Sequence, residues 1–290
     1  MKNVGFIGLG NMGARMSKLL LEADYKVIGY DINEELINQL LAKGLKKASS
    51  LNDISKDIDI IITMLPNGEI VEKVLDSIVD SLKPETLIVD CSTIDVDKAK
   101  ELHKKCADKK LLFLDAPVSG GVGGAENGTL TFMVGGSENA YEKMLPLFEI
   151  LGKKSLLCGS SGSGQATKAC NNMLLATTMI GVGEAFNLGK NLGLDPQKQF
   201  EILSTSTGSC WSINSYCPIK GVGPESPADN NFQPGFSASL MFKDLTIALK
   251  AINTTNTSAP FGKRAQENFR DMVKDNKGEL DFSAITKFNE

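Results

Sequence analysis

The sequence predicts an α/β protein in which a doubly wound parallel sheet domain is followed by an all-α domain, the two joined by a long helix. In the first half of the 290-residue chain, short apolar runs alternate with amphipathic helical patterns, which is typical of a parallel sheet covered by helices. A glycine-rich turn follows the first apolar run. From about residue 165 to residue 190, one helical pattern continues without a proline, and further helical patterns follow it.

The composition is that of an ordinary globular protein. Apolar residues make up 42% and charged residues 23% of the chain, and the net charge of −4 offers no basic surface for nucleic acid. No apolar run approaches the ~20 residues of a membrane span. Because the first strand begins near Val4, we expect no signal peptide. The chain as written should act in the cytoplasm, or in the mitochondrial matrix if a leader was removed.

The cysteine and histidine content argues against a metal site. The six cysteines are dispersed and form no C-x-x-C pair, which favours a reducing compartment. His103 is the only histidine, so we expect no zinc site of mixed cysteine and histidine ligands. His103 falls in a lysine-rich helical pattern and is expected to be a surface residue.

The first candidate site is a glycine turn between a strand and a helix. It follows the strand at residues 4–7 and reads Gly8-Leu9-Gly10-Asn11-Met12-Gly13. In a Rossmann-like dinucleotide site, such glycines permit the tight turn, the approach of a pyrophosphate and close helix packing. The N-terminus of the following helix then faces the phosphates. A purely structural glycine turn is the alternative interpretation.

Asp31 ends the second strand, residues 26–30, and is the candidate that selects the cofactor. A carboxylate at this place accepts hydrogen bonds from the ribose hydroxyls of NAD. No arginine or lysine follows within residues 32–35, so the additional phosphate of NADP would face an uncompensated negative charge. The sequence therefore favours NAD over NADP.

The strand and helix alternation continues to about residue 157. Helices are expected near residues 33–42 and 138–151 and in the segments that end at about residues 79 and 106. Strands are expected at residues 58–64, 87–90, 111–114, 130–134 and 155–157. Ligands of such sheets lie beyond the carboxyl ends of the strands, so Leu65, Pro66 and Thr93 should line the cofactor cleft.

A glycine-rich loop follows Asp115. It runs through Ser119, Gly120 and Gly121 and is too rich in glycine to be expected in the core. Successive backbone N–H groups at these three residues would form an anion-binding concavity suited to a carboxylate. A flexible surface loop is the alternative interpretation.

Lys168 is the candidate for acid–base chemistry. It follows a linker at residues 159–162, which we expect to separate a domain of residues 1–162 from one of residues 163–290. Lys168 and Asn172 are one helical turn apart and share a face that is otherwise apolar. A lysine base that works near neutral pH needs its ammonium form destabilised by burial or by a nearby cation such as Lys243. A solvated lysine beside an ordinary asparagine is the alternative.

The second half is expected to be helical, at residues 196–203, around Trp211, and at residues 238–252 and 262–273. Residues 216–235 are rich in proline, glycine and asparagine and show no period; a loop of that length is usually functional or disordered. Its aromatic frame, which includes Trp211 and Phe236, would suit the wall of a pocket. A solvated ion pair is the simplest interpretation of Lys243 and Asp244.

Taken together, the chain resembles the β-hydroxyacid dehydrogenase family over essentially its whole length. The residues that carry the resemblance are Gly5–Gly13, Asp115–Gly121, Gly162–Asn172 and Phe242–Leu245. The resemblance implies that Lys168 is catalytic and that substrate is held by Asn172 and the backbone of Ser119, Gly120 and Gly121. It also implies cofactor contacts from the glycine turn and from Asp31, Leu65, Pro66, Thr93 and Lys243. Ile70 stands where a polar cofactor contact is expected, so that contact is not carried over.

The resemblance implies a small hydroxyacid substrate and NAD as the cofactor. Residues 210–212 and 230–232, with Tyr216 and Pro218, are similar to the branch that oxidises 3-hydroxyisobutyrate to methylmalonate semialdehyde in valine degradation. Hydride would pass to NAD while Lys168 removes the hydroxyl proton. A reductase of tartronate semialdehyde or of another short semialdehyde, and a catalytically silent NAD-binding interaction module, are the alternatives. A homodimer or homotetramer is expected, without a nucleic-acid or membrane partner.

Overall fold

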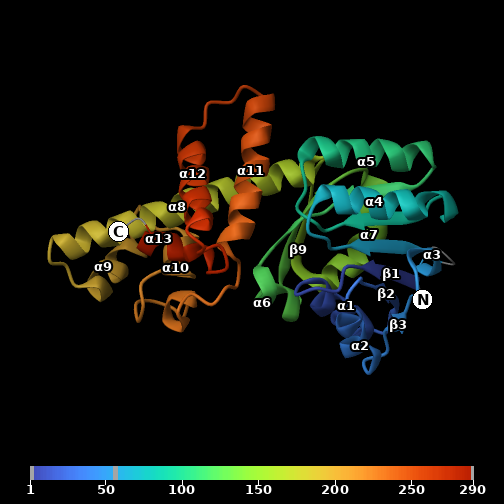
Figure 1. Cartoon of the computed structure of the whole chain (residues 1–290), viewed down its shortest axis with the longest axis horizontal. Coiled ribbons are helices and arrows are strands. Elements are labelled where there is room, and N and C mark those ends of the chain that lie inside the picture. Colours follow the sequence, from blue (N-terminus) through green and yellow to red (C-terminus); the bar gives the residue numbers. More distant parts are fainter. Residues whose placement is uncertain (1–2, 55–57, 289–290) are drawn as a thin grey trace. The chain divides into compact units, whose positions relative to one another are not determined.

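The computed structural model describes residues 3–54 and 58–288 and divides the chain into two compact units, Met1–Lys168 and Ala169–Glu290. The first unit is α/β and the second is helical (Figure 1), which confirms the predicted fold class. The functional division after residue 162 stays a prediction.

The first unit is built on one sheet, which has nine strands in the part of the chain that the structure describes, ordered β3-β2-β1-β4-β5-β6-β8-β7 with β9 beside β8. The strands are β1 Asn3–Ile7, β2 Lys26–Tyr30, β3 Lys46–Lys47, β4 Ile60–Thr63, β5 Leu87–Asp90, β6 Leu112–Asp115, β7 Val118–Ser119, β8 Leu130–Gly135 and β9 Gly152–Gly159. Strands β1 to β6 pair in parallel, as predicted. Strand β8 runs antiparallel to β6 and β7.

The glycine-rich loop is not the flexible surface loop that was the alternative interpretation. Val118 and Ser119 form strand β7, in which Val118 pairs with Phe132 and Ser119 pairs with Thr131. The glycines from Gly121 on lie in a short helix, α6 (Gly121–Glu126). The loop is therefore part of the sheet edge rather than a segment without regular structure. Its backbone positions are fixed by the ladder to β8.

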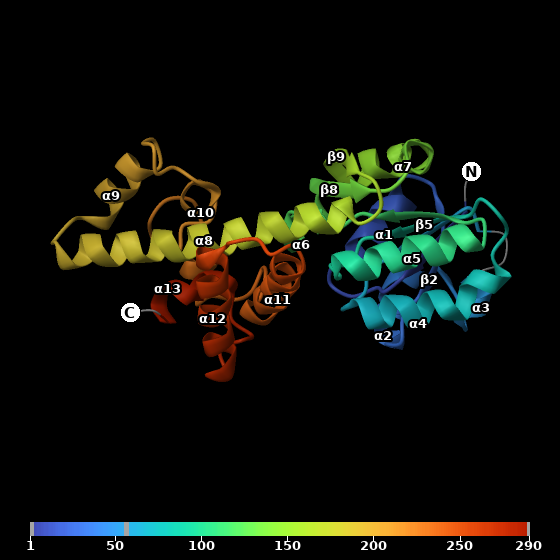
Figure 2. The same cartoon turned by 90° about the horizontal axis from the view of Figure 1, so that it is seen from above.

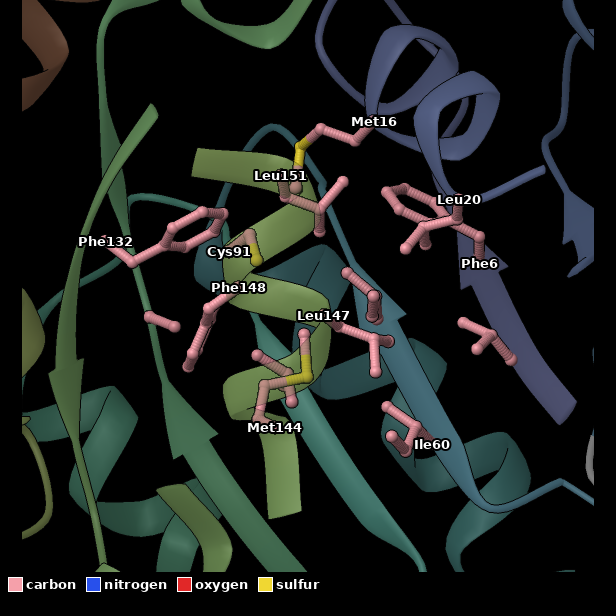
Figure 3. Close-up of a cluster of buried hydrophobic side chains, with 14 of the residues drawn as sticks. Phe6, Met16, Leu20, Ile60, Cys91, Phe132, Met144, Leu147, Phe148 and Leu151 are labelled. Carbon is pink, nitrogen blue, oxygen red and sulfur yellow. The ribbon is translucent and has the colours of Figure 1, made fainter. Parts of the chain in front are cut away.

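Both faces of the sheet are covered by helices. They are α1 Gly13–Glu22, α2 Glu34–Leu41, α3 Leu51–Ile54, α4 Gly68–Ile78, α5 Val96–Asp108, α6 Gly121–Glu126 and α7 Glu138–Leu151. Figure 2 shows α4 and α5 side by side along the sheet. Successive strand side chains point to opposite faces, so Phe6 belongs to the same cluster as Met16 and Phe148 (Figure 3). Ile7 belongs to the cluster on the other face, with Leu75. A sheet buried on both faces requires such continuously apolar strands.

The second unit is formed by helices. They are α8 Ser163–Asn191, which begins in the first unit, α9 Pro196–Leu203, α10 Trp211–Asn214, α11 Ala238–Thr254, α12 Pro260–Lys274 and α13 Ile285–Phe288. The main core cluster includes Met179, Met241 and Phe269. The expected long loop contains a 3-10 helix, Pro227–Asn230, that Ser226 caps. Over residues 3–54 and 58–288, no helix has the length and apolar character needed to cross a membrane.

Candidate active site

The glycine turn has the geometry of a dinucleotide site. Gly8 adopts a φ of +93°, and a Cβ atom there would overlap the carbonyl oxygen of Met64. A Cβ atom at Gly13 would overlap the carbonyl oxygen of Gly8, so helix α1 can start close to β1 only with glycine at this position. A Cβ atom at Gly10 would meet nothing within 4 Å, which leaves room for a ligand beside the backbone. Helix α1 has no side-chain hydrogen bond from its N-cap residue Met12, which suits a helix N-terminus that receives phosphate.

Asp31 binds this turn from the end of β2. Its Oδ2 accepts a hydrogen bond from the Leu9 N–H at 2.7 Å, and its Oδ1 accepts one from the Asn33 N–H at 2.8 Å. Each carboxylate oxygen has a further lone pair, so ribose hydroxyls can still bind. Leu9 is fully buried and its N–H is bound to Asp31, so a direct contact of Leu9 with a cofactor stays a prediction. These residues together fit NAD.

The carboxyl ends of β4 and β5 place the other expected cofactor residues. The Leu65 N–H donates to Ser92 Oγ at 2.9 Å, which joins the loop that carries Pro66 to the loop that carries Thr93. Pro66 is exposed and Thr93 is half-buried. This edge of the sheet is where ligands of doubly wound folds bind.

A buried aspartate, Asp90, lies beneath these loops. Its Oδ1 accepts hydrogen bonds from Thr63 Oγ1 at 2.8 Å and from the Ser92 N–H at 3.1 Å. Burial raises the pKa of Asp90 to about 6, hydrogen bonds from Ser92 and Thr63 oppose that rise, and the negative charge of Asp115 adds to it. Asp115 is its register partner on the neighbouring strand β6.

Lys168 is 8% exposed and lies in the second turn of α8. Its Nζ donates to the carbonyl oxygen of Val118 at 2.8 Å. Burial, one of the two causes expected to destabilise the charged form of Lys168, is therefore observed, and the solvated interpretation was wrong. Val118 directly precedes Ser119, so Lys168 lies against the strand that leads into the predicted carboxylate-binding segment. Gly120 and Gly121 both have positive φ, 131° and 60°.

In the second unit, Asn172 forms a buried polar pair with Asp244. Asn172 is 2% and Asp244 is 4% exposed, and Asn172 Nδ2 donates to Asp244 Oδ2 at 2.6 Å. The Lys243 Nζ lies 3.4 Å from Asp244 Oδ1. The expected ion pair of Lys243 and Asp244 is therefore present, but it is not solvated, because Asp244 is buried and holds Asn172.

Trp211 and Phe236 belong to one aromatic cluster of the second unit. The ring of Trp211 stacks on Tyr216 at 4.9 Å between centroids, and Tyr216 stacks on Phe282 at 5.6 Å. Phe236 meets Phe282 edge to face at 5.9 Å. Burial is the main reason that the pKa of Tyr216 is raised, and its hydroxyl donates to the buried Asp281 at 2.9 Å. Trp211 remains 50% exposed, so part of this residue is still open to solvent.

His103 corrects another expectation. Its side chain is only 14% exposed, and its Nε2 lies 2.8 Å from Oδ1 of the fully buried Asp115. The sequence pattern suggested a surface residue because its neighbours on α5 are lysines. The partner lies at the end of β6, and the fold alone brings the two together.

Gln165 is a structural contact that was not expected from the sequence. Gln165 is 1% exposed; its Nε2 donates to the Ser92 carbonyl at 2.7 Å, and its Oε1 accepts from the Ile94 N–H at 3.1 Å. Its place inside the Gly162–Asn172 motif was the available sign of such a role. Within the described residues, no group of three or more histidine, cysteine, aspartate or glutamate side chains is arranged to hold a metal ion.

Comparison with family models divides the chain into two matches. Residues 3–159 match the model described as the NAD binding domain of 6-phosphogluconate dehydrogenase. Residues 162–289 match the model described as NAD-binding of NADP-dependent 3-hydroxyisobutyrate dehydrogenase. Both descriptions concern nicotinamide-dependent oxidoreductases.

Comparison with individual proteins gives similarity over nearly the whole chain. The mitochondrial 3-hydroxyisobutyrate dehydrogenase of Drosophila melanogaster is 44% identical over 285 residues, which cover 98% of this chain and 88% of the relative. The probable 3-hydroxyisobutyrate dehydrogenase of Mycobacterium tuberculosis is 42% identical, with 98% and 97% covered. A solved structure of the Mycobacterium tuberculosis 3-hydroxyisobutyrate dehydrogenase with L-serine matches with a TM-score of 0.96 at 41% identity, covering 100% of this chain and 99% of that one.

Proposed function

Because the chain belongs to the 3-hydroxyisobutyrate dehydrogenase family of β-hydroxyacid dehydrogenases, we propose that it oxidises 3-hydroxyisobutyrate to methylmalonate semialdehyde with NAD, a step of valine degradation. As a member of that family it is an NAD-binding oxidoreductase that acts on a CH–OH group. The observation that carries the proposal is the buried Lys168, whose Nζ is held at 2.8 Å from the Val118 carbonyl. A catalytically silent binding module would have no use for a desolvated ammonium group.

The residues that would hold NAD are the glycine turn, Asp31, Leu65, Pro66, Thr93 and Lys243. The chemistry that NAD would supply when bound is acceptance of the hydride from C3 of the substrate. The turn backbone and the α1 N-terminus supply N–H groups for the pyrophosphate. Asp31 supplies acceptors for the ribose hydroxyls and disfavours a phosphate in the same place.

Lys168 moves the proton in this proposal. A neutral lysine amine has two N–H bonds and one lone pair, and the hydrogen bond to Val118 fixes how the amine points. The lone pair then accepts the proton of the substrate hydroxyl as the C3–H bond breaks. In the reverse direction, the same ammonium protonates the carbonyl oxygen.

The other proposed roles are recognition. The backbone N–H groups of Ser119, Gly120 and Gly121 bind the substrate carboxylate, and Asn172 binds the hydroxyl. The methyl group needs an apolar wall, which we assign to the aromatic cluster that includes Trp211 and Phe236. These assignments rest on the family resemblance and on the burial, strand pairing and ring contacts described above.

Steady-state kcat/KM with NAD on four compounds tests the proposal. The highest value is expected for 3-hydroxyisobutyrate. Loss of the methyl group should make 3-hydroxypropionate about 10- to 200-fold poorer, and glycerate should be poorer because its 2-hydroxyl would be buried without a partner. A maximum on glycerate would move the chain to the tartronate semialdehyde branch, and inactivity on every compound would favour the silent module.

6-Phosphogluconate is the fourth compound and should be inert. The arginines of this chain are Arg15, Arg264 and Arg270. Each lies within 3.2 Å of a carboxylate, on Glu126, Glu267 and Asp271 respectively. None of these guanidinium groups is therefore left as an unpaired receptor for a phosphate. Turnover of this compound would contradict the substrate assignment.

We also propose a homodimer or homotetramer. Large apolar side chains of the second unit are exposed near the end of α8, in the segment that follows it and on α9: Leu188 at 60%, Leu192 at 69%, Leu194 at 53% and Ile202 at 65%. Large exposed apolar side chains close together in the chain favour an interaction surface. Sedimentation equilibrium at micromolar concentration should give a mass of two or four chains, and a monomer would contradict the proposal.

For the compartment, we propose the cytoplasm or the mitochondrial matrix. All six cysteines are free thiols, which suits a reducing environment. The Drosophila melanogaster relative is named as mitochondrial. Subcellular fractionation of the native source would distinguish the two compartments.

A further inference from the structure

The N-terminus of α8 is capped by a carboxylate from another element. Asp115 accepts the Gly162 N–H on Oδ1 and the Gln165 N–H on Oδ2, both at 2.9 Å. Gln165 lies in the first turn of α8, where N–H groups lack partners within the helix. A negative charge at this place is also stabilised by the helix dipole. Asp115 therefore acts as the cap of a helix that starts 48 residues later in the chain.

The carboxylate of Asp115 is closely surrounded by backbone. The residue is fully buried, and a Cβ atom added at Gly135 or at Gly164 would lie 2.8 Å from Asp115 Oδ2. The third donor to this carboxylate is His103, whose Nε2 lies 2.8 Å from Oδ1. The imidazole is held edge to face against Phe113, with ring centroids 4.8 Å apart.

The contacts of Asp115 also fix the position of Lys168. Asp115 accepts from the Gln165 N–H, and three residues further along both segments the Val118 carbonyl accepts from Lys168 Nζ. The strand segment and the first turns of α8 are thus joined at two successive points. A shift or rotation of the helix start would change the direction of the lysine amine.

We propose that His103 is a positioning residue for Lys168. It donates a hydrogen bond to Asp115 and keeps that carboxylate oriented toward the two N–H groups of α8, and the helix start in turn places the lysine. His103 itself touches no substrate and transfers no proton in the reaction. The effect of His103 on catalysis rests on the proposed function of Lys168. The effect of His103 on the cap of α8 does not.

The test uses two substitutions of the full chain that separate donation from packing. In His103→Gln, the amide Nε2 keeps a donor near the position of the imidazole Nε2, without the ring. In His103→Phe, the ring against Phe113 is kept and the donor is lost. Lys104→Ala is the matched control, because Lys104 is on the same helix with a side chain 78% exposed.

Three readouts are taken for each variant. They are kcat and KM on 3-hydroxyisobutyrate, the thermal midpoint, and hydrogen exchange by mass spectrometry of peptides covering residues 160–168 in the absence of substrate and NAD. His103→Phe should lower kcat about tenfold with KM within threefold, since a misdirected base slows the chemical step more than binding. Exchange should accelerate in residues 160–168 and stay unchanged in peptides of α12. His103→Gln and Lys104→Ala should remain within about threefold of the wild type in kcat.

The other outcomes overturn the inference. If His103→Phe keeps full turnover and unchanged exchange while His103→Gln loses both, packing of the ring is what matters and donation to Asp115 is not. If both variants lose activity in step with a lower thermal midpoint and faster exchange throughout, His103 has a general structural role. If Lys168→Ala proves fully active, the proposed function fails, but the exchange result for residues 160–168 still decides whether His103 supports the cap.

Discussion

Asn172 on α8 donates its Nδ2 to Asp244 Oδ2 at 2.6 Å, and Asn171 Nδ2 donates to Asn172 Oδ1 at 2.9 Å. Both atoms of the Asn172 amide are therefore engaged, so the orientation of the group is defined. A short hydrogen bond to a buried carboxylate is among the stronger ones in proteins. Asp244 thus controls the direction in which Asn172 can meet a ligand.

We expect Asp244→Ala to lower kcat/KM on 3-hydroxyisobutyrate by about 10- to 100-fold, because Asn172 loses its buried acceptor and Lys243 loses a nearby counter-charge. Asn172→Ala should have an effect of similar size. If Asp244 acts through Asn172, the double variant should be little worse than Asn172→Ala alone. Strictly additive losses would show that the two residues act independently.

Lys168→Ala should lower kcat by at least ~10² because the base is lost. The affinity for NAD, measured by fluorescence quenching, should stay within a few-fold because the turn from Gly8 to Gly13 is unchanged. Lys190→Ala is the matched control, since Lys190 is an exposed residue in the last turn of the same helix. Near-normal turnover of Lys168→Ala would remove Lys168 from the mechanism.

The elements that the sequence predicted well are those whose cause is local. Helix α9 was expected at residues 196–203 and is observed as Pro196–Leu203, with Asp195 accepting the Lys198 N–H at its start. Proline in the first turn and a capping aspartate before it are both visible in the sequence. The glycine turn was predicted for the same reason, because the glycines that its backbone requires, Gly8, Gly10 and Gly13, are visible in the sequence.

The parts that could not be predicted depend on contacts between distant segments. Nothing near His103 shows that its partner is Asp115, and the lysines around it point to a surface helix. Strand β7 is two residues long, and its pairing with β8 decides its structure more than its own glycine-rich neighbourhood does. Burial of Asp244 likewise follows from α8 packing in the second unit, whereas the sequence shows only an adjacent acid and base.

Wild-type protein should prefer NAD over NADP by ~10²-fold or more in kcat/KM, which corresponds to roughly 2.7 kcal/mol. The reason is the carboxylate of Asp31, followed by Ile32, which is 93% exposed and uncharged. Asp31→Ser combined with Ile32→Arg should reduce the preference for NAD over NADP in kcat/KM. The same double substitution should also weaken the binding of NAD, because the Leu9 N–H loses the Asp31 oxygen that accepts from it at 2.7 Å. Equal use of both cofactors by the wild type would contradict the cofactor assignment.

Asp90 makes the stability of the protein depend on pH in an unusual direction. Burial raises its pKa from 3.8 to about 6, so between these values the folded state holds a proton that the unfolded state has released. Stability therefore decreases as pH rises through this window. Above pH 6 the ionised carboxylate is present in both states, and its desolvation cost in the folded state is fully expressed.

Asp90→Asn isolates this contribution, because the amide oxygen can still accept from Thr63 and Ser92 and its charge does not change with pH. The variant should gain about 2 kcal/mol of unfolding free energy relative to the wild type when the pH is raised from 4 to 7.5. Chemical denaturation of both proteins at the two pH values measures this difference. Subtracting the unfolding free energy of the wild type from that of the variant at each pH removes the effect of the other carboxylates. A difference that is constant with pH would show that Asp90 is ionised at both values, and that its burial is compensated by the hydrogen bonds from Thr63 and Ser92.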